Sequence, residues 1–317
     1  MTEPVAPAEP IRPADGDETD EAAEVRAFWQ RLGLPGLMDL HVHFLPPPIE
    51  RAVWREFDNG GELIGRDWPI RYRFDADERL RLLRAFGVRR FPTLPYAHKP
   101  GVAGFLNDWS RDFAAAVPEV LWTATFYPEP EAPSYVEELV RDGVALFKVH
   151  SQVGRFHVDD PLLDGVWEIL ADSGTPVVAH VGSGPVGTPY TGPAALARLL
   201  RRFPRLRVLV AHLGAPEVAD FVALAEQYDG VHLDTSMALA PFFTDPHGGR
   251  GGVDAALVPR LGALRQRVVY GSDFPTLPFR YADQLGWLAA LDLGDDWLRD
   301  VCWHNALRLL GTGVADS

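Results

Sequence analysis

Short apolar runs alternate with longer amphipathic stretches along most of the chain. The apolar runs are rich in β-branched residues, and the stretches between them carry apolar residues at helical spacing. This alternation is typical of βαβ units that build a parallel sheet. It predicts eight strands, over Leu37–Phe44, Val88–Tyr96, Val120–Tyr127, Ala145–His150, Pro176–Val181, Arg207–Leu213, Val231–Ser236 and Arg267–Ser272.

The stretches between the strands carry the signals that begin and end helices. Asp75–Gly87 has acidic residues in its first turn, a basic last turn and a terminal glycine, an order that complements the helix dipole. Ser134–Gly143 and Asp160–Gly174 are similar. A final helix is predicted over Asp295–Leu310, and we expect it to pack on the outside of the fold.

The number and composition of these units favour a closed barrel. The runs at 177–179 and 208–211 are apolar at every position, as expected when both faces of a parallel sheet are covered. Eight strand–helix units are typical of a (β/α)₈ barrel, and an open doubly wound sheet is the alternative. We therefore predict an α/β fold, a distorted (β/α)₈ TIM barrel. Its first and seventh βα loops, residues 45–74 and 237–255, are extended, and the chain ends in a C-terminal helix.

The amino terminus differs in composition from the rest of the chain. Residues 1–24 hold eight acidic residues and a single basic one, interleaved with proline and alanine. Such a segment buries too little apolar surface to fold alone. We predict a disordered acidic tail over residues 1–30 and a single barrel domain over residues 31–317.

Charge and composition exclude several classes of protein. The net charge is −14, with no basic stripe to bind a nucleic-acid backbone. No apolar run is long enough to span a membrane. The single cysteine, Cys302, cannot form an internal disulfide, which fits a reducing compartment. We expect a cytoplasmic protein with a small-molecule substrate, no nucleic-acid or membrane partner, and the option of a homo-oligomer.

Histidines gather where a barrel has its active site. His41 and His43 point to the same side of a strand because residues two apart share a face. Five of the ten histidines lie at the ends of four predicted strands, and a carboxylate ends the eighth. Since the carboxyl ends of barrel strands converge, these groups are expected to meet. They are His41, His43, His150, His180, His212 and Asp273. Imidazoles with one carboxylate suit zinc or another first-row ion better than magnesium or calcium.

Lysine is rare in this chain, which makes its positions informative. Arginine supplies nearly all the positive charge, and the only two lysines are Lys99 and Lys148. Lys148 lies inside a strand that is predicted to be buried, so its ammonium group must be paired, shifted in pKa or modified. It either pairs with a carboxylate such as Asp273, or with a substrate group, or acts at the metal. His150 shares its strand face.

Five motifs resemble the amidohydrolase superfamily, in particular its branch that includes the aminocarboxymuconate-semialdehyde decarboxylases. They are Asp39-x-His41-x-His43, Phe147-Lys148-x-His150, Pro176–His180, Ala211–Gly214 and Gly271–Pro275. The resemblance runs from about Leu37 to Leu310. It implies a distorted barrel with one catalytic divalent ion, usually zinc.

The resemblance also implies roles for individual residues. His41, His43, His180 and Asp273 would be the metal ligands, and His212 would orient or deprotonate the catalytic water. Binuclear members of the superfamily carry a carboxylated lysine at the position of Lys148. The branch that this chain resembles most is mononuclear, so we favour one metal and expect Lys148 to contact the substrate carboxylate or the transition state.

These parts predict a metal-dependent hydrolase. Zinc with an open position lowers the pKa of bound water to about 7, and Asp273 would accept and return the proton. The substrate would be an amide, ester or lactone. The alternative is a non-oxidative decarboxylase, a C–C lyase, acting on a carboxylated aromatic or unsaturated compound. The candidate substrate contact on the strand face of Lys148 is His150. Further candidates, for which packing or a surface position is the alternative, are Trp54, Arg71, Arg73, His98, Phe126 and Tyr127.

One glycine-rich segment matches the motif of a different class of enzyme, the dinucleotide-dependent oxidoreductases. Gly182–Gly187 formally matches a dinucleotide-binding loop after a strand. Three nearby prolines, Pro185, Pro189 and Pro193, obstruct a helix that would begin directly at this loop, and no acidic residue follows at residues 202–210 to bind a ribose. We interpret it as the βα loop beside His180.

Overall fold

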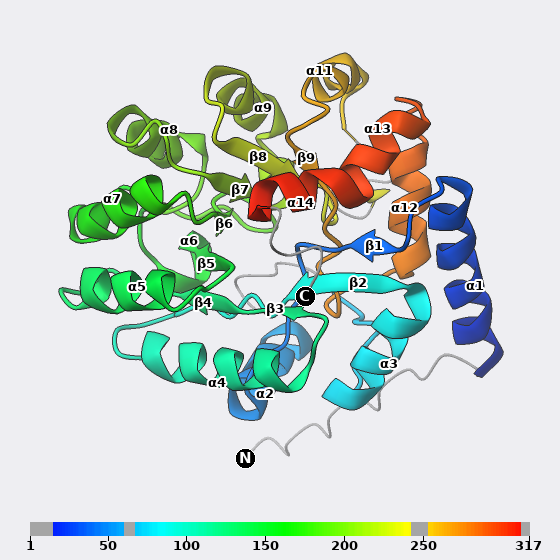
Figure 1. Ribbon diagram of the computed structural model, residues 1–317, viewed down its shortest axis with the longest axis horizontal. Helices are drawn as coiled ribbons and strands as arrows, with labels where there is room; N and C mark the ends of the chain where they lie inside the picture. Colours follow the sequence, from blue (N-terminus) through cyan, green and yellow to red (C-terminus); the bar gives the residue numbers. More distant parts are fainter. Residues whose placement is uncertain (1–14, 60–66, 242–252, 312–317) are drawn as a thin grey trace.

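The strands form a ring with helices around it. The computed structural model describes residues 15–59, 67–241 and 253–311. β1, β2 and β3 pair in one parallel sheet, and β4 to β9 pair in order in a second (Figure 1). The strands are β1 (Leu37–Met38), β2 (Val88–Pro92), β3 (Val120–Leu121), β4 (Thr123–Thr125), β5 (Leu146–His150), β6 (Val177–His180), β7 (Val208–Val210), β8 (Val231–Asp234) and β9 (Val268–Val269).

Helices and helical turns connect successive strands. The helices are α1 (Asp15–Arg31), α2 (Pro47–Asp58), α3 (Ala76–Phe86), α4 (Ala103–Ala116), α5 (Ala132–Arg141), α6 (Ser151–Gly154), α7 (Asp164–Ser173), α8 (Pro193–Arg202), α9 (Val218–Gln227), α11 (Val258–Ala263), α12 (Tyr281–Ala289), α13 (Asp295–Arg299) and α14 (Asn305–Leu310). The helical turns are η1 (Pro161–Leu163), η2 (Ala211–Gly214), η3 (Ala255–Leu257) and η4 (Asp300–His304). In α3 the Asp75 side chain accepts a hydrogen bond from the Glu78 amide, and Gly87 ends the helix at a φ of 82°, so this predicted helix is confirmed.

The ring closes between the first and last strands. Val42 bridges Phe274 in parallel. The Asp273 amide donates to the His41 carbonyl at 2.7 Å, and the His43 amide donates to the Phe274 carbonyl at 2.7 Å. These bonds exclude the open doubly wound sheet and confirm the predicted α/β barrel.

The observed strands are shorter than the predicted ones. The predicted strand at 120–127 divides at Trp122 into β3 and β4. The stretches after β1 and β9 lack the regular hydrogen bonds between strands. Some of their backbone amides donate hydrogen bonds to side chains instead. Asp39 Oδ1 accepts hydrogen bonds from the His41 and Ser272 amides at 3.1 and 3.0 Å. These irregular ends hold the residues of the candidate site.

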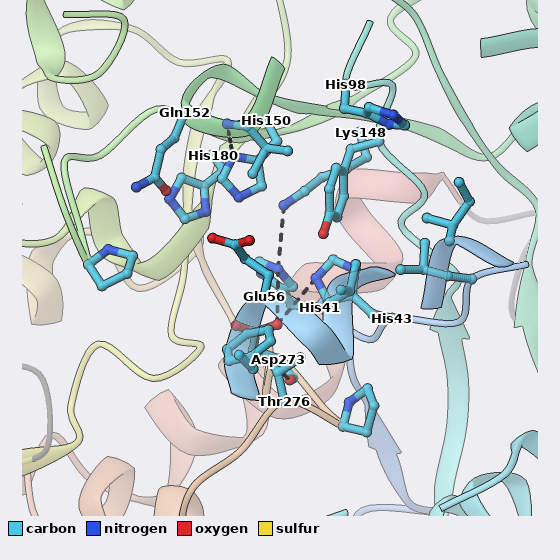
Figure 2. A pocket seen from close by; sticks show the side chains of 18 of the residues that line it. His41, His43, Glu56, His98, Lys148, His150, Gln152, His180, Asp273 and Thr276 are labelled. Carbon is cyan, nitrogen blue, oxygen red and sulfur yellow. Dashed lines mark hydrogen bonds and ion pairs between the residues drawn. The ribbon is translucent and has the colours of Figure 1, made fainter. Parts of the chain in front are cut away.

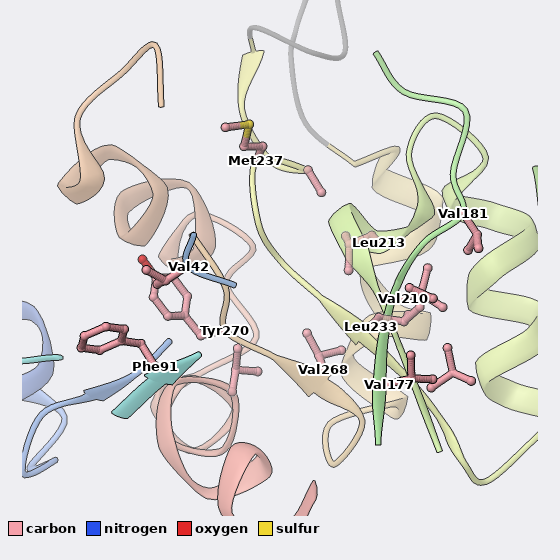
Figure 3. Packing of buried hydrophobic residues seen from close by; sticks show 14 of the residues in the cluster. Val42, Phe91, Val177, Val181, Val210, Leu213, Leu233, Met237, Val268 and Tyr270 are labelled. Carbon is pink, nitrogen blue, oxygen red and sulfur yellow. The ribbon is translucent and has the colours of Figure 1, made fainter. Parts of the chain in front are cut away.

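Alternation along the strands separates two apolar layers. In β5, Phe147 and Val149 pack toward the helices, whereas Leu146 belongs to the cluster inside the barrel. The same inner cluster takes one side chain from most of the other strands: Met38, Leu121, Val178, Leu209 and Val269. Figure 3 shows outer-layer residues, among them Val177, Val210 and Leu233. The inner positions of β5 above Leu146 are Lys148 and His150, so the same alternation that fills the core supplies the site.

The C-terminal helix closes one end of the barrel. Ala306 and Leu309 of α14 are buried in the inner cluster with Met38 and Leu146. Figure 1 shows α14 lying across the centre of the ring of strands. The expectation that this segment packs on the outside is wrong, because apolar side chains of α14 cover the end of the barrel that would otherwise be open to water.

The predicted tail is helical in the part that the structure describes. Residues 15–31 form α1, which lies beside α3 and α12 (Figure 1). Glu21 is buried and accepts hydrogen bonds from the Tyr72 hydroxyl at 2.6 Å and the Ala282 amide at 3.2 Å, and Val25 is fully buried. The prediction of disorder is therefore wrong for residues 15–30, since these contacts compensate the conformational entropy that the segment loses when it folds. Residues 1–14 lie outside the described residues.

The two predicted long loops lie only partly within the described residues. The first, residues 45–74, contains α2, and its residues 60–66 lie outside them. In the second, residues 237–255, positions 242–252 lie outside them. Across the described residues, every helix is too short or too polar to cross a membrane.

Candidate metal centre

A cavity of about 580 Å³ lies at the carboxyl ends of the strands. Its floor holds the predicted histidines, Lys148 and Asp273, and α2 supplies Ile49, Val53 and other residues to its roof. Figure 2 shows His41, His43, Lys148, His180 and Asp273 around this space. The volume fits a small organic molecule.

Three predicted metal ligands come together. His41, His43 and Asp273 each offer a ligand atom, and these atoms lie within 4.8 Å of one another. Asp273 Oδ1 lies 3.2 Å from His43 Nε2 and 3.9 Å from His41 Nε2. The residues come from the stretches after β1 and β9, which the ring closure places side by side. Their side chains therefore point at one volume although 230 positions separate His43 from Asp273 in the sequence.

Buried partners orient both imidazoles. His41 Nδ1 lies 2.8 Å from Asp234 Oδ2, and His43 Nδ1 lies 3.1 Å from the Leu94 carbonyl oxygen. A carboxylate or carbonyl beside Nδ1 holds the proton there and leaves the Nε2 lone pair free. In both rings it is Nε2 that faces Asp273. This arrangement fits a divalent cation held by two Nε2 atoms and a carboxylate oxygen.

The electrostatics of the site favour a neutral His41 ring and an ionised Asp273 carboxylate. Burial, and then the charge of Lys148, lower the pKa of His41 well below its usual value. Burial alone would raise the pKa of Asp273, but the hydrogen bond with His43 and the nearby imidazoles lower it well below its usual range. A cation requires these protonation states of its ligands.

Asp273 is also held in an unusual backbone conformation. Its φ is 69°, in the left-handed region that residues with a Cβ rarely adopt. Its carbonyl accepts hydrogen bonds from the Thr276 amide at 3.0 Å and the Thr276 hydroxyl at 2.8 Å. Strain that neighbouring contacts maintain is typical of functional sites.

His180, the fourth predicted ligand, lies beside this group and outside it. Its Nε2 is 3.0 Å from the Gly184 carbonyl oxygen, and its ring stacks on His150 with centroids 3.9 Å apart. Its ring centroid is 4.8 Å from that of His212. His180 thus lines the cavity, and its role as a ligand stays a prediction.

His212 faces the cavity from η2, with its ring fixed from behind. Its Nδ1 lies 3.0 Å from the Ser236 carbonyl oxygen and 2.8 Å from the Ser236 hydroxyl. Its ring centroid is 4.8 Å from that of His41. His212 has a φ of 58°, a second strained position at the site. The structure places it beside the predicted ligands, as the sequence indicated.

Lys148 is fully buried among the predicted ligands. Its Nζ lies 3.4 Å from His41 Nε2. Burial lowers the pKa of Lys148 to about 8, against the opposing effect of Asp234 and Asp273. The expectation of an ion pair with Asp273 is not met, because no N–O contact within 4.0 Å joins them among the described residues. Its amine is a donor that points at the cavity.

Three of the other candidate contacts line the cavity. These are Trp54, His98 and His150. Phe126 is instead buried against Phe147 and Trp167. The remaining three, Arg71, Arg73 and Tyr127, lie outside the lining. Each makes a contact within the protein instead. The Arg71 amide donates a hydrogen bond to the Leu277 carbonyl, Arg73 forms an ion pair with Asp58, and the Tyr127 hydroxyl donates a hydrogen bond to the Gly154 carbonyl.

Sequence reasoning missed the residue that orients His41. Asp234 is fully buried and accepts hydrogen bonds from the His212 and Ser236 amides at 2.9 and 3.0 Å, besides its contact with His41. Its place at the end of a predicted strand was a usable signal, the same one that identified Asp273. The cavity residues of α2 and the loops, including Glu50, Glu56, Trp68, Tyr96 and Arg155, carried no such signal.

No helix begins directly at the glycine-rich loop after β6. α8 begins only at Pro193, and the Gly184 carbonyl faces His180. A Cβ at Gly182 would lie 2.7 Å from the Ala215 carbonyl oxygen, so glycine there permits two loops to pack closely. The dinucleotide-binding interpretation has no support in this geometry.

Sequence comparison identifies the class of protein. The family model described as amidohydrolase matches residues 38–312. The chain therefore belongs to the amidohydrolase family, and the resemblance noted in its motifs is confirmed. No curated protein matches the chain in a direct sequence comparison.

Solved structures with the same fold include enzymes of two kinds. An uncharacterised TIM-barrel protein from Bordetella bronchiseptica has a TM-score of 0.67 and 20% identity, over 86% of this chain and 98% of its own. 5-Carboxyvanillate decarboxylase from Sphingomonas paucimobilis has a TM-score of 0.59 and 18% identity, over 87% and 99%.

A structure described as a putative 2-pyrone-4,6-dicarboxylic acid hydrolase from Pseudomonas putida has a TM-score of 0.57 and 17% identity, over 88% of this chain and 99% of its own. Further decarboxylases of aromatic acids are also similar, one of them complexed with manganese. At these identities the likeness shows the barrel fold alone.

Proposed function

We propose that this protein is a metal-dependent decarboxylase of a carboxylated aromatic compound. The observation that carries the proposal is the cavity itself. Its floor combines His41, His43, Asp273 and the buried amine of Lys148, and its wall includes Trp54 and Trp68. A flat apolar ring fits the wall, and its carboxylate would lie beside Lys148 and the proposed metal on the floor. Two of the similar structures named above act on carboxylated rings by their descriptions.

His41, His43 and Asp273 would hold the metal, with His180 as the proposed fourth ligand. Zinc suits imidazole and carboxylate donors, and one ion fits the cluster of His41, His43 and Asp273. When bound, such an ion supplies Lewis-acid stabilisation of negative charge on the substrate.

The protein's own residues have distinct roles in the proposed reaction. Lys148 would pair with the carboxylate that leaves as carbon dioxide. The aromatic walls would exclude water from that carboxylate, and the loss of hydration would destabilise it. The carbon–carbon bond breaks, carbon dioxide leaves, and the electron pair on the ring carbon takes a proton. Asp273 would relay this proton from solvent to the ring carbon, which is a far stronger base than a carboxylate once the carbon–carbon bond breaks. His212 would hydrogen-bond a ring oxygen, and His150 would contact the substrate.

Hydrolysis of a lactone is the second candidate. Asp273 and His212 lie at the same floor, where they could activate a water and protonate a leaving oxygen. The hydrolase among the similar structures supports this candidate.

Product analysis separates the two reactions. The metal-loaded protein would be incubated with hydroxybenzoates and with carboxylated lactones, and carbon dioxide release and ring opening would be followed. We expect carbon dioxide release that falls at least a hundredfold in Asp273→Asn. Ring opening without carbon dioxide would favour the hydrolase, and neither product from any compound would contradict the proposal.

A further inference from the structure

The roof of the cavity contains a carboxylate that the proposed reaction does not use. Ile49, Val53 and Phe57 of α2 line the cavity at the three- and four-residue spacing of one helix face. Glu56 shares that face and also lines the cavity. Figure 2 shows its side chain in the same space as Lys148 and Asp273. A charged residue thus lies on the helix face whose other named residues are apolar.

Glu56 has no partner among the residues that the structure describes, in contrast to the other acid on this face. Glu50 is paired with the buried guanidinium of Arg79. Glu56 makes no hydrogen bond or ion pair with any of the residues that the structure describes, and its side chain is half-buried. A half-buried carboxylate without a donor loses hydration and gains nothing in return. Because Glu56 lines the cavity, a molecule bound there can supply the donor.

The helix that carries Glu56 is held at both ends. Glu50 in its first turn pairs with Arg79, and Asp58 in its last turn pairs with Arg73. Between them the ring of Phe57 packs on Trp68, with centroids 5.5 Å apart. The backbone of α2 at Glu56 thus has a fixed place beside the cavity, which is what a binding residue requires.

We propose that Glu56 is a substrate-binding residue that accepts a hydrogen bond from a hydroxyl or amino substituent on the substrate ring. The inference rests on the proposed function for one point, that the substrate carboxylate faces Lys148 on the floor. The substrate class is then an aromatic carboxylate with a hydrogen-bond donor on the side of the ring remote from that carboxylate. A carboxylate acceptor makes a strong hydrogen bond to such a donor, and it would repel a second anionic group.

Ligand binding tests this inference without turnover. The metal-loaded protein would be titrated by calorimetry with 3- and 4-hydroxybenzoate and with the matching methoxybenzoates, which keep the oxygen and lose the donor. In the wild type we expect the hydroxy compound of at least one pair to bind about tenfold to a hundredfold more tightly. In Glu56→Leu this preference should disappear, whereas Arg55→Gln, an exposed change on the same helix, should keep it.

Thermal unfolding distinguishes binding from a structural role. Leucine continues the apolar face of α2, so Glu56→Leu should unfold at or above the wild-type temperature. The inference is overturned by a wild type without the hydroxyl preference, by a preference that persists in Glu56→Leu, or by a variant that unfolds several degrees lower. A wild type that shows the Glu56-dependent preference and releases no carbon dioxide would contradict the decarboxylase proposal and still support this inference.

Discussion

The two nitrogens of His41 have separate tasks. Nδ1 lies against the fully buried Asp234, and Nε2 faces Asp273 and Lys148. The sequence motif at 39–43 identified the ring, because alternation places His41 and His43 on one face. It could not identify the tautomer, since that depends on Asp234, which is 193 positions away in the chain.

Removal of the Asp234 charge should weaken metal binding while the protein stays folded. In Asp234→Asn the amide no longer holds the Nδ1 proton of His41 as a carboxylate does, and we expect metal affinity to fall about tenfold to a hundredfold. Competition with a chelator measures this loss. The exposed Asp229→Asn is the control. Equal metal affinity in Asp234→Asn and the wild type would contradict the assigned role of Asp234.

The element that sequence patterns describe least well is α2. No helix was predicted there, because residues 45–74 contain several prolines and aromatic residues and were interpreted as a loop. By contrast, α3 was predicted from its cap and terminal glycine, which are local signals. Elements defined by local chemistry were predicted, and those that cover a cavity through distant contacts were not.

The ion pairs at the two ends of α2 should differ in strength. Arg79 is 2% exposed in its pair with Glu50, whereas Arg73 and Asp58 are 25% and 33% exposed. Glu50→Gln leaves a buried guanidinium without its counter-charge, so we expect a loss of about 2 kcal/mol in the free energy of unfolding. Asp58→Asn should cost about 0–1 kcal/mol.

Urea unfolding of the two variants measures these costs. Similar losses in both would show that the Glu50–Arg79 pair does not anchor the helix. A fixed position for Glu56 would then lose its main support.

At the scale of the whole molecule, the barrel was predictable and its ends were not. Eight apolar runs with helical segments between them are enough to indicate the fold. The closure of one barrel end by α14 and the docking of α1 through Glu21 depend on tertiary contacts that leave no periodic signal. The convergence of His41, His43 and Asp273 was predicted because it follows from the barrel; the cavity roof does not.

The pH dependence of stability offers a test of barrel packing. His232 in β8 is 9% exposed, and burial lowers its pKa from 6.5 to about 4. The folded chain binds this proton less readily than the unfolded chain, so stability is lost as the pH falls from 6.5 toward 4. His232→Asn should remove about 2 kcal/mol of the decrease in unfolding free energy between pH 7 and pH 5. His157→Asn is the control, and identical pH profiles for wild type and His232→Asn would refute the burial of a neutral ring.

We propose that His41, His43 and Asp273, from distant parts of the sequence, hold one divalent cation. The most direct test is the metal content per chain after reconstitution with zinc and removal of free metal. We expect about one equivalent in the wild type and in His98→Gln, which changes a cavity histidine outside the cluster, and almost none in His41→Ala. A wild type that retains no metal, or a His41→Ala variant that retains as much as the wild type, would contradict it.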